Sequence, residues 1–585
     1  MLEIAQLPDY IRLLAELTVL TLAVIGWGNL ALFLLPKRVD AGGAGPNLFD
    51  AGVAGLAALY VLAVVLSLAL PFNAVIGDGI VLAGLIGYAY AVRLRRGEGG
   101  SWRTRWVMLL SLAAYAAWGT ALTPLHYDTG LYHLQVIQWF QTEPLPLGLA
   151  NLHTRFGYNS AWFAIAAVVG KSRLLPDAAF LLNGVVSVLV CGALLESGWE
   201  RIRSRNITFG AVLAITCVVT YLGSASQSLF TWMGLSPTTD VPAALLTIYA
   251  IVLLSDLVET GSGKTLTDPD PTWRLWLCAV AGCLAVAVKL SQFPVMLALM
   301  AAVYHLRLMD RGTAWRMAIA RTAGAVVVIA GLWVVHALML SGCLLFPYGS
   351  TCLAWIPWSV NPEDANHLAH MLKMWARAPL VDPGEVPGGL GWIPLWIENM
   401  WPDRAVLRWI LGASALLTLA ALALRILSRG KSGFISSAGF RWSLGVSLAG
   451  LAVCVATAPD PRYYLGFLLV LPCSLTARFL LSPWVAWDVR ARWVPVAAIA
   501  VILSGLTWWN VRRVLLVTPK ELPLHYWRHL PEPAYHVVET SSGFQVKTPD
   551  TGDQCWGLPA PCSPADMIHQ DLQAGRALGR TVMTR

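Results

Sequence analysis

Long apolar runs, separated by short polar segments, recur along almost the whole of the 585-residue chain. A helix of about 20 apolar residues spans a bilayer, and many of the runs approach that length. The pattern therefore predicts an all-α polytopic membrane protein with about fourteen transmembrane helices. The predicted spans cover residues 15–36, 52–70, 73–93, 106–123, 176–196, 207–223, 241–258, 274–288, 291–306, 321–341, 404–424, 442–457, 464–481 and 494–509.

Composition agrees with this class, because 57% of the residues are hydrophobic and only 13% are charged. Soluble domains average about 25% charged residues. Lys and Arg gather in four loops, near residues 93–105, 201–205, 307–321 and 425–441. All four loops fall on one side, predicted to be cytoplasmic, if residues 158–171 do not cross the membrane. The net charge of +8 then reflects these loops, and no nucleic-acid partner is expected.

The remaining loops are predicted to face the periplasm of a bacterial inner (cytoplasmic) membrane. They are residues 124–175, 224–240, 342–403 and 457–463, together with the tail from residue 510. On this basis the chain divides into three parts. These are an N-terminal transmembrane bundle (1–120), a main transmembrane module (121–509) and a small periplasmic C-terminal domain (510–585).

Two segments of the first outer loop are predicted to be juxtamembrane helices. A helix from Thr129 would place Asp128, Tyr132 and Gln135 on one face, which is typical of an amphipathic helix lying in the interface. The segment 158–170 is apolar but too short to span, and its Trp suits an interfacial position. Of the other outer segments, 342–403 is predicted to be an ordered lid, and the tail a small cap with a hairpin.

Four cysteines form two short-range pairs, both in segments that are predicted to be outside. They are Cys343 and Cys352 in "CLLFPYGSTC", and Cys555 and Cys562 in "CWGLPAPC". Disulfides persist in an oxidising compartment, so both pairs are predicted to be bonded. A zinc site built from the two pairs together is the alternative, although neither pair has CxxC spacing.

The most polar outer stretch is "HYDTGLYHLQ" at residues 126–135. Asp128 stands there among cationic or titratable neighbours that could bind an anion, and an acid beside cations at a lipid interface suits chemistry on a lipid phosphate. The alternative is that Asp128 only caps a helix by accepting backbone N–H bonds. The neighbours are His126, His133, His153 and Arg155.

Three later outer turns also carry ionisable residues. Asp240 in "GLSPTTDVPAALL" stands where the chain re-enters the membrane, as either a functional acid or an N-cap. Lys289 in "GCLAVAVKLSQFP" interrupts an apolar stretch, as either a site residue or a snorkelling lysine. Arg462 in "ATAPDPRYYLGF" either serves a site or simply pairs with Asp460. Four separate turns would thus present acids and cations at one membrane face.

In their order and common side, these turns resemble the GT-C superfamily of membrane glycosyltransferases. "YDTGLYHLQVIQWF" and "RFGYNSAWF" stand where the family has a catalytic acid and a tyrosine on a juxtamembrane helix, matched by Asp128 and Tyr132. Asp240 matches an Asp that begins a helix in the family. The stretch "AVAGCLAVAVKLSQFP" matches a family turn, in which Lys289 is the lysine. Arg462 and Tyr463 match a late "RY" in the family. The resemblance covers roughly residues 120–480 and is greatest to bacterial members that carry "YDTGLYH" and a late "CW..P.PC".

The resemblance implies a GT-C-like bundle that transfers a sugar from a polyprenyl-phosphate donor to a glycan, lipid or protein acceptor by inverting displacement. Asp128 would accept the acceptor's proton, and cations would stabilise the departing phosphate. A divalent metal, Mg or Mn, held between Asp128 and Asp240 is a less favoured alternative. The implied phosphate-binding residues are Lys289, Arg462, His133 and Arg155, and the implied substrate-binding residues are His126, Tyr127, Tyr132, Gln135, Asn159, Asp240 and Tyr463.

The chain departs from the family pattern in three ways. Four predicted spans precede the acidic loop, the segment matching "PPLYYW" lacks its prolines, and no "WWD" run is present. The last absence argues against transfer to Asn in sequons. A polymerase or ligase of lipid-linked glycans remains an alternative, as does a secondary transporter, which should instead place charges at the midplane.

Overall fold

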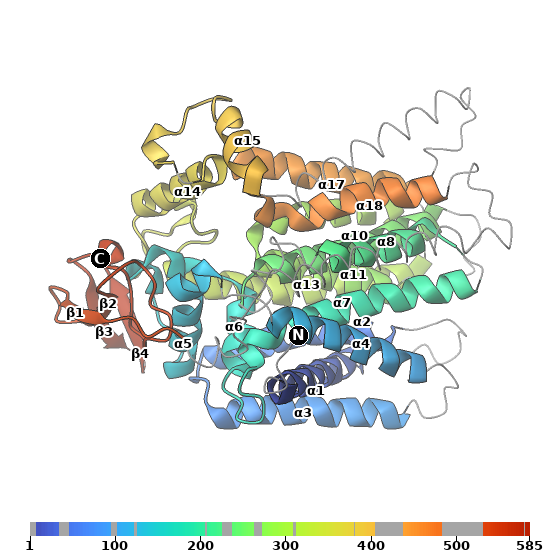
Figure 1. Cartoon of the computed structure of the whole chain (residues 1–585), viewed down its shortest axis with the longest axis horizontal. Helices are drawn as coiled ribbons and strands as arrows, with labels where there is room; N and C mark the ends of the chain where they lie inside the picture. Colours follow the sequence, from blue (N-terminus) through green and yellow to red (C-terminus); the bar gives the residue numbers. More distant parts are fainter. Residues whose placement is uncertain are drawn as a thin grey trace.

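The computed structural model is mostly helical, with little sheet (Figure 1). The long helices lie side by side and form a bundle, and smaller elements cover one end of it. The structure describes residues 7–33, 46–94, 102–121, 126–204, 207–224, 237–262, 272–307, 312–379, 381–403, 437–481, 530–577 and 579–585.

The long helices of the described residues correspond to twelve of the predicted spans. Eight helical segments are long and apolar enough to cross a membrane, and three shorter apolar helices accompany them. The chain is therefore a multi-pass membrane protein. The predicted spans 404–424 and 494–509 lie outside the described residues, so fourteen crossings remain a prediction. The helices are α1 (Leu7–Phe33), α2 (Leu48–Ser67), α3 (Ala74–Leu94), α4 (Trp102–Ala121), α7 (Ala178–Arg203), α8 (Phe209–Ser224), α10 (Asp240–Ser262), α11 (Thr272–Val288), α12 (Pro294–Arg307), α13 (Gly312–Ser341), α17 (Ala438–Thr457) and α18 (Leu465–Leu480).

The first helices pack closely against one another because a small residue brings two backbones together. An added Cβ at Gly28 of α1 would overlap the carbonyl oxygen of Ala51 on α2, an interface typical of membrane helices. The start of α2 is fixed by a capping box in which Asn47 and Asp50 bond each other's backbone N–H groups. Helix α2 also packs on α7, because a Cβ at Gly52 would meet the side chain of Leu189.

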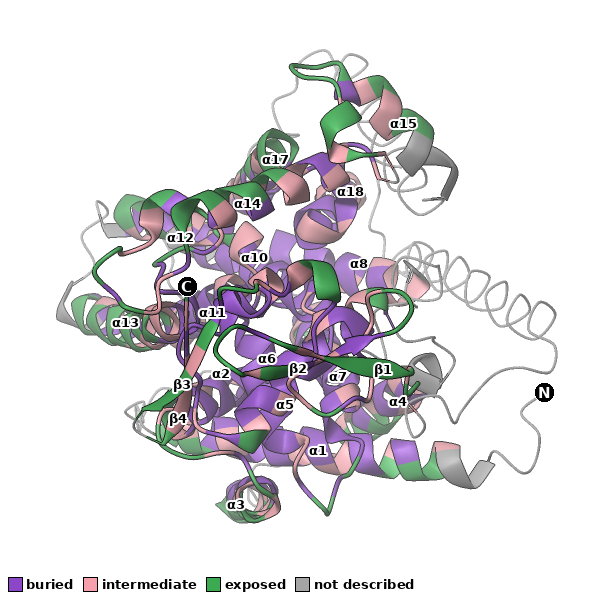
Figure 2. Cartoon of the chain, turned by 90° about the vertical axis from the view of Figure 1, so that its left-hand side faces the viewer, coloured by how far each residue is buried: buried purple, intermediate pink, exposed green. Residues whose placement is uncertain are grey.

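Burial distinguishes central from peripheral helices. Helix α10 is buried along its span, whereas α3 and α13 present exposed apolar faces at the sides of the bundle (Figure 2). In a membrane protein such exposed faces are the surfaces that meet lipid. The core therefore lies around α10 and the helices packed on it. Because α10 is central, its first turn lies near the middle of one end of the bundle.

The basic ends of several helices meet at one end of the bundle. Arg105 at the start of α4 pairs with Glu196 near the end of α7 at 2.5 Å. Arg201, one turn further along α7, pairs with Asp256 of α10 at 3.0 Å. These ion pairs place the described parts of the first two basic loops at the same end.

The opposite end carries short elements between the long helices. A π-helical turn (Thr129–His133) leads into α5 (Leu134–Thr142), and α6 (Ala161–Val169) follows. With nine residues, α6 is about 13 Å long and cannot cross a bilayer. Segment 342–403 is largely ordered in short helices, of which α14 (Pro362–Arg377) and α15 (Trp392–Asp403) are the longer ones.

Two expectations for these short helices are wrong in detail. Helix α5 was expected to lie in the interface with one exposed face, but most of it is buried, including apolar residues on opposite sides such as Ile137 and Trp139. Trp162 of α6 was expected at the lipid interface, but it is fully buried and donates to Asn183 of α7 at 2.8 Å. Both helices are packed inside the protein, because the C-terminal segment and the long helices cover the faces that were expected to contact lipid.

The C-terminal segment folds into two antiparallel hairpins at the same end as α5 and α14 (Figures 1 and 2). One hairpin joins β1 (Tyr535–Glu539) and β2 (Gln545–Pro549), and the other joins β3 (Gln573–Ala577) and β4 (Arg580–Thr584). Leu147 ties the second hairpin to the segment between α5 and α6, because its N–H donates to Thr581 O and its carbonyl accepts from Met583 N, each at 2.9 Å. The structure contains disulfides Cys343–Cys352 and Cys555–Cys562.

Candidate functional site

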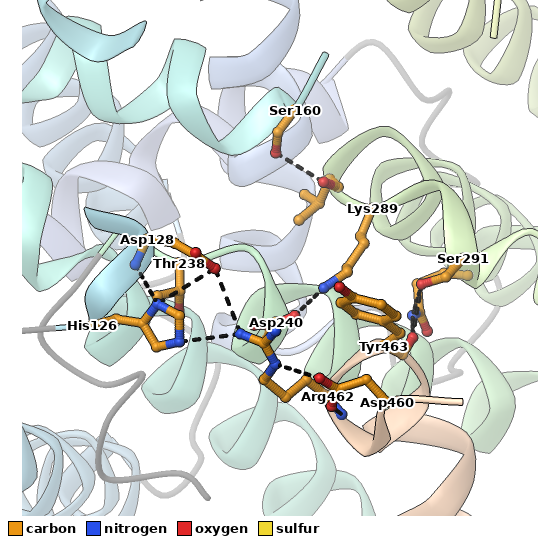
Figure 3. A network of polar contacts seen from close by, with 12 residues as sticks. His126, Asp128, Ser160, Thr238, Asp240, Lys289, Ser291, Asp460, Arg462 and Tyr463 are labelled. Carbon is orange, nitrogen blue, oxygen red and sulfur yellow. Dashed lines mark hydrogen bonds and ion pairs between the residues drawn. The ribbon is translucent and has the colours of Figure 1, made fainter. Parts of the chain in front are cut away.

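Four turns that are far apart in sequence meet at the hairpin-covered end of the bundle (Figure 3). Asp128 immediately precedes the π-turn, and Asp240 is the first residue of α10. Lys289 follows α11 in extended conformation, and Arg462 lies in the 3-10 turn before α18. The structure thus brings together the acids and cations of all four predicted outer turns.

Arg462 is the residue that joins these turns. Its Nη1 atom lies 3.5 Å from Asp128 Oδ2 and 3.2 Å from His126 Nε2. Its Nε atom donates to Asp460 Oδ2 at 3.0 Å. The alternative that Arg462 merely pairs with Asp460 is therefore incomplete, because the same guanidinium also holds the segment that carries Asp128.

Asp128 does not act as a helix cap, since its side chain makes no capping hydrogen bond. Instead the carboxylate faces Arg462 and the imidazole of His126, and 26% of the side chain is exposed. Burial alone would raise the pKa of this carboxyl, but His126 and Arg462 outweigh burial and lower the pKa to about 2. Asp128 is therefore an ionised, partly accessible carboxylate at physiological pH.

His126 faces an N–H donor at each ring nitrogen, and a neutral imidazole can accept a hydrogen bond from only one of them. Its Nδ1 lies 3.1 Å from the backbone N of Asp128, and its Nε2 faces the guanidinium of Arg462. A doubly protonated imidazole would turn two donors against these groups. Burial also lowers the pKa of His126, despite the opposing charge of Asp128. The ring therefore supports Arg462 and Asp128, and only its protonated form adds to Arg462 in lowering the pKa of Asp128.

A second ion pair, between Lys289 and Asp240, lies beside the first. The Lys289 Nζ stands 4.2 Å from the ring centroid of Tyr463, which Arg462 also approaches, so the ring borders both cations. Ser291 Oγ and Gln292 Nε2 each donate to the backbone oxygen of Tyr463 at 2.7 Å. Sequence reasoning missed Ser291 and Gln292, although both stand in the quoted "KLSQFP" stretch.

Arg155 differs from the other two cations. Its guanidinium lies 5.0 Å over the ring of Trp375 on α14. Among the described residues it makes no ion pair, whereas Lys289 and Arg462 are both matched by carboxylates. Arg155 is still close enough to lower the pKa of Asp128, although it contributes less than His126 and Arg462. Arg155 is therefore the cation of this region that can bind an anionic ligand without first giving up an ion pair.

Aromatic rings line the same region. Tyr132 contacts Tyr158 edge-on with ring centroids 5.6 Å apart, and His133 packs 4.4 Å from Tyr132. The hydroxyl of Tyr158 is buried and, among the described residues, has no hydrogen-bond partner. Sequence reasoning chose the neighbouring Asn159 instead of Tyr158. An orphaned buried hydroxyl is a signal that only the structure supplies.

Four of the predicted site residues are used elsewhere. Asn159 donates to the Trp333 backbone at 2.6 Å and contacts His336, so it ties the segment between α5 and α6 to α13. Gln135 is buried against the C-terminal loop, and Tyr127 bonds Asp553. His133 is also buried, and burial lowers its pKa to about 3, so the expectation of a cationic phosphate ligand there is not met.

A metal between Asp128 and Asp240 would find few protein ligands. Among the described residues, no group of three or more His, Cys, Asp or Glu side chains could hold a metal ion. Each of the two carboxylates already faces a cation, Arg462 or Lys289. The donor set therefore fits an ion-pair network better than a metal site.

One protein family matches residues 11–469, and its description is Domain of unknown function (DUF8201). The chain belongs to this family. The matched segment includes all four converging turns and stops before the C-terminal hairpins. No curated protein and no solved structure matches the chain.

Proposed function

We propose that this protein is a membrane glycosyltransferase of the GT-C type, which transfers a sugar from a polyprenyl-phosphate donor to a periplasmic or lipid-linked acceptor. The observation that carries the proposal is the convergence of four turns on Asp128 at one end of a membrane bundle. A donor with a lipid tail and a phosphate headgroup reaches such an end from the bilayer. The active end would face the periplasm of a bacterial inner membrane.

Asp128 would receive the proton of the acceptor hydroxyl. The acceptor oxygen forms a bond to the anomeric carbon, and the bond from that carbon to the phosphate oxygen breaks, with its electron pair leaving on the phosphate. A carboxylate whose pKa is about 2 is a weak base. It suffices late in the reaction, because the attacking oxygen becomes strongly acidic as it bonds to an electron-poor carbon.

Arg155 is the best-placed cation for the leaving phosphate. Lys289 and Arg462 would need to release part of their hold on carboxylates before binding another anion. Arg155 pays no such cost, and its planar guanidinium suits bidentate binding of phosphate oxygens. We therefore assign the main phosphate contact to Arg155, and to Lys289 and Arg462 the task of holding the turns together.

The aromatic side chains would bind the sugar. Tyr132, Tyr158 and Tyr463 offer ring faces or edges near Asp128, and the hydroxyl of Tyr158 could donate to a sugar or phosphate oxygen. A ligand oxygen at that point would satisfy a group that is otherwise buried without a partner.

The experiment is direct binding of polyprenyl phosphate to the full chain in detergent. We expect saturable binding to the wild type and a loss of about tenfold in affinity for Arg155→Met, since a charge-assisted hydrogen bond contributes roughly 1.5–3 kcal/mol. Arg173→Met is the matched control, because Arg173 is a more exposed arginine of the same outer loop that pairs with Asp78.

Two other outcomes decide against parts of the proposal. Absence of binding to the wild type, with and without added divalent cations, would reject a polyprenyl-phosphate donor. Loss of wild-type binding on addition of EDTA would move the phosphate contact from Arg155 to a metal between Asp128 and Asp240.

A further inference from the structure

The disulfide-closed loop Cys555–Cys562 lies directly on the turn that carries Asp128. The backbone N–H groups of Cys555 and Trp556 both donate to the carbonyl oxygen of Gly130, at 2.8 and 3.1 Å. Gly130 is the second residue of the π-turn that follows Asp128. A π-turn is a rare local geometry, and this one is supported from outside by a segment more than 400 residues away.

The far part of the loop is held by two glutamines that follow the turn. Gln135 donates to the carbonyl oxygen of Leu558 at 2.8 Å and accepts from the N–H of Cys562 at 3.1 Å. Gln138 accepts from the N–H of Ala560 at 2.9 Å. The loop is thus bonded along its length to the turn and to α5, largely through its own backbone.

Trp556 makes the tightest contact. An added Cβ at Gly130 would lie 2.5 Å from ring carbons of Trp556, so the indole sits where any larger residue would stand. Trp556 is also the one non-glycine residue with positive φ (42°) in the described part of the chain. Such a conformation is strained for a bulky side chain and persists where the surroundings hold it.

Just before this loop, two residues also hold Tyr127, the neighbour of Asp128. Asp553 accepts from the hydroxyl of Tyr127, and Gln554 donates to its backbone oxygen at 3.2 Å. The segment 553–562 therefore grips the Asp128 turn from both sides, at Tyr127 and at Gly130. The disulfide keeps this short segment in the closed shape that presents its N–H groups to the turn.

We propose that segment 553–562 is a clamp that sets the position of the Asp128 carboxylate, with Trp556 as the positioning residue, and that it works only while Cys555 and Cys562 are bonded. The clamp concerns only the conformation of the Asp128 turn. Its effect on catalysis rests on the function proposed above.

The first test needs no substrate. In a Cys343→Ser/Cys352→Ser background, Cys555–Cys562 is the one remaining disulfide of the described cysteines. Hydrogen exchange of peptides covering 126–138 and 553–562 is measured before and after reduction. We expect both peptides to exchange at least about tenfold faster on reduction, because local opening governs exchange. Faster exchange in 553–562 with no change in 126–138 would overturn the clamp.

A bump-and-hole pair tests Trp556 itself. Gly130→Ala should displace the indole and speed exchange of 126–138, whereas the same change in a Trp556→Ala background should add almost nothing. Trp556→Phe, which keeps a ring over Gly130, should restore slow exchange relative to Trp556→Ala. Equal effects of Gly130→Ala in both backgrounds would show that the ring does not support the turn.

The catalytic consequence is read from transfer kinetics. Trp556→Ala should lower kcat while leaving the affinity for polyprenyl phosphate and the melting temperature close to wild type, and Trp556→Phe should recover most of kcat. A parallel loss of affinity and melting temperature would mean a general structural role and would overturn the positioning claim. If the wild type shows no transfer at all, the proposed function fails, while the exchange results still decide on the clamp.

Discussion

The two ends of the bundle both contain ion pairs, but the pairs are built differently. At the basic end, Arg201 and Asp256 are 3.0 Å apart, with side chains only 11% and 4% exposed, and Thr208 bridges them. At the other end, Arg462 and Asp128 are 3.5 Å apart, and both side chains are about a quarter exposed. The first pair joins two helices, whereas the second joins two turns.

This difference separates a structural pair from a candidate site. A closed pair on helices has no capacity for a ligand, because its hydrogen bonds are already made within the protein. A looser pair on turns leaves a carboxylate oxygen accessible and can exchange partners. Buried charge alone therefore does not distinguish a candidate site in this protein, and the partial exposure of the Asp128 carboxylate is what leaves it accessible to a ligand.

The largest effect is expected at Asp128. Asp128→Asn keeps the shape of the side chain but cannot take a proton, so turnover should fall by about 10²–10⁴-fold, the usual contribution of a general base. The melting temperature should fall only moderately, because Asn loses the ion pair with Arg462 but no capping bond, so turnover is compared per folded molecule. The measurement is the initial rate of sugar transfer from a polyprenyl-phosphate donor.

The control for this variant is Asp382→Asn, in the short turn that follows α14. Asp382 accepts the N–H of Gly384 in an exposed turn, which Asn can also do. It should keep wild-type turnover. If Asp128→Asn retains more than about a tenth of the wild-type rate, the base lies elsewhere.

The second largest effect concerns stability at the opposite end. Asp256→Asn leaves Arg201 buried without its carboxylate, and breaking a buried pair in this way typically costs about 3–5 kcal/mol. We expect a clearly lower melting temperature but an unchanged transfer rate per folded molecule. A large fall in the rate of the folded protein would erase the distinction between the two ends.

A smaller effect should show whether Lys289 holds the turns together or contacts the donor. Lys289→Met leaves Asp240 buried and unpaired, so it should lower the melting temperature. Adding Asp240→Asn should recover part of that loss, because the stranded charge is removed. If the double variant regains stability but not transfer, Lys289 contacts the donor directly, contrary to the framing role assigned here.

The smallest effect is expected from pH. The pKa of Asp128 in the folded protein, about 2, lies below its unfolded value, so the ionised carboxylate stabilises the fold at neutral pH. That contribution is present above about pH 4 and is lost as the pH falls towards 2. Between pH 7 and 5 the transfer rate should therefore change by less than about twofold on account of Asp128.

Any fall in rate or stability between pH 7 and 5 is expected to come from His126. Burial lowers its pKa, so the fold favours the neutral ring, and stability is lost as the pH falls below the unfolded value of about 6.5. Rates measured from pH 7 to 5 on wild type and His126→Gln test this. A strong acid limb that persists in His126→Gln would show that Asp128 titrates far above the expected range.

The sequence predicts the helical membrane fold well, because long apolar runs have few alternatives in a bilayer. It also names Asp128, Asp240, Lys289 and Arg462, since an ionisable residue at a membrane face is costly and therefore conspicuous. It offers the Arg462–Asp460 pair as one alternative, but it does not predict that Arg462 also meets Asp128 or that Lys289 meets Asp240. That matching depends on which turns meet, and the sequence spacing of the turns carries no information about it.

Other residues were misjudged for a related reason. Gln135 and Asn159 are polar and close to Asp128 in sequence, yet one bonds the C-terminal loop and the other α13. A sequence read without its partners cannot tell a polar residue that binds substrate from one that satisfies a distant backbone. Tyr158 was missed because an aromatic residue beside an apolar helix is usually core, and only its unpartnered hydroxyl distinguishes it.

The close contact of α1 and α2 at Gly28 bears on the order in which the protein is built. This interface uses residues near the beginning of the chain only, so it can form as soon as the second helix enters the membrane during synthesis. The contact between His126 and Arg462 joins residues 336 positions apart, and the clamp at Gly130 needs the last part of the chain. A nascent chain would therefore have α1 and α2 packed together long before the Asp128 site is complete.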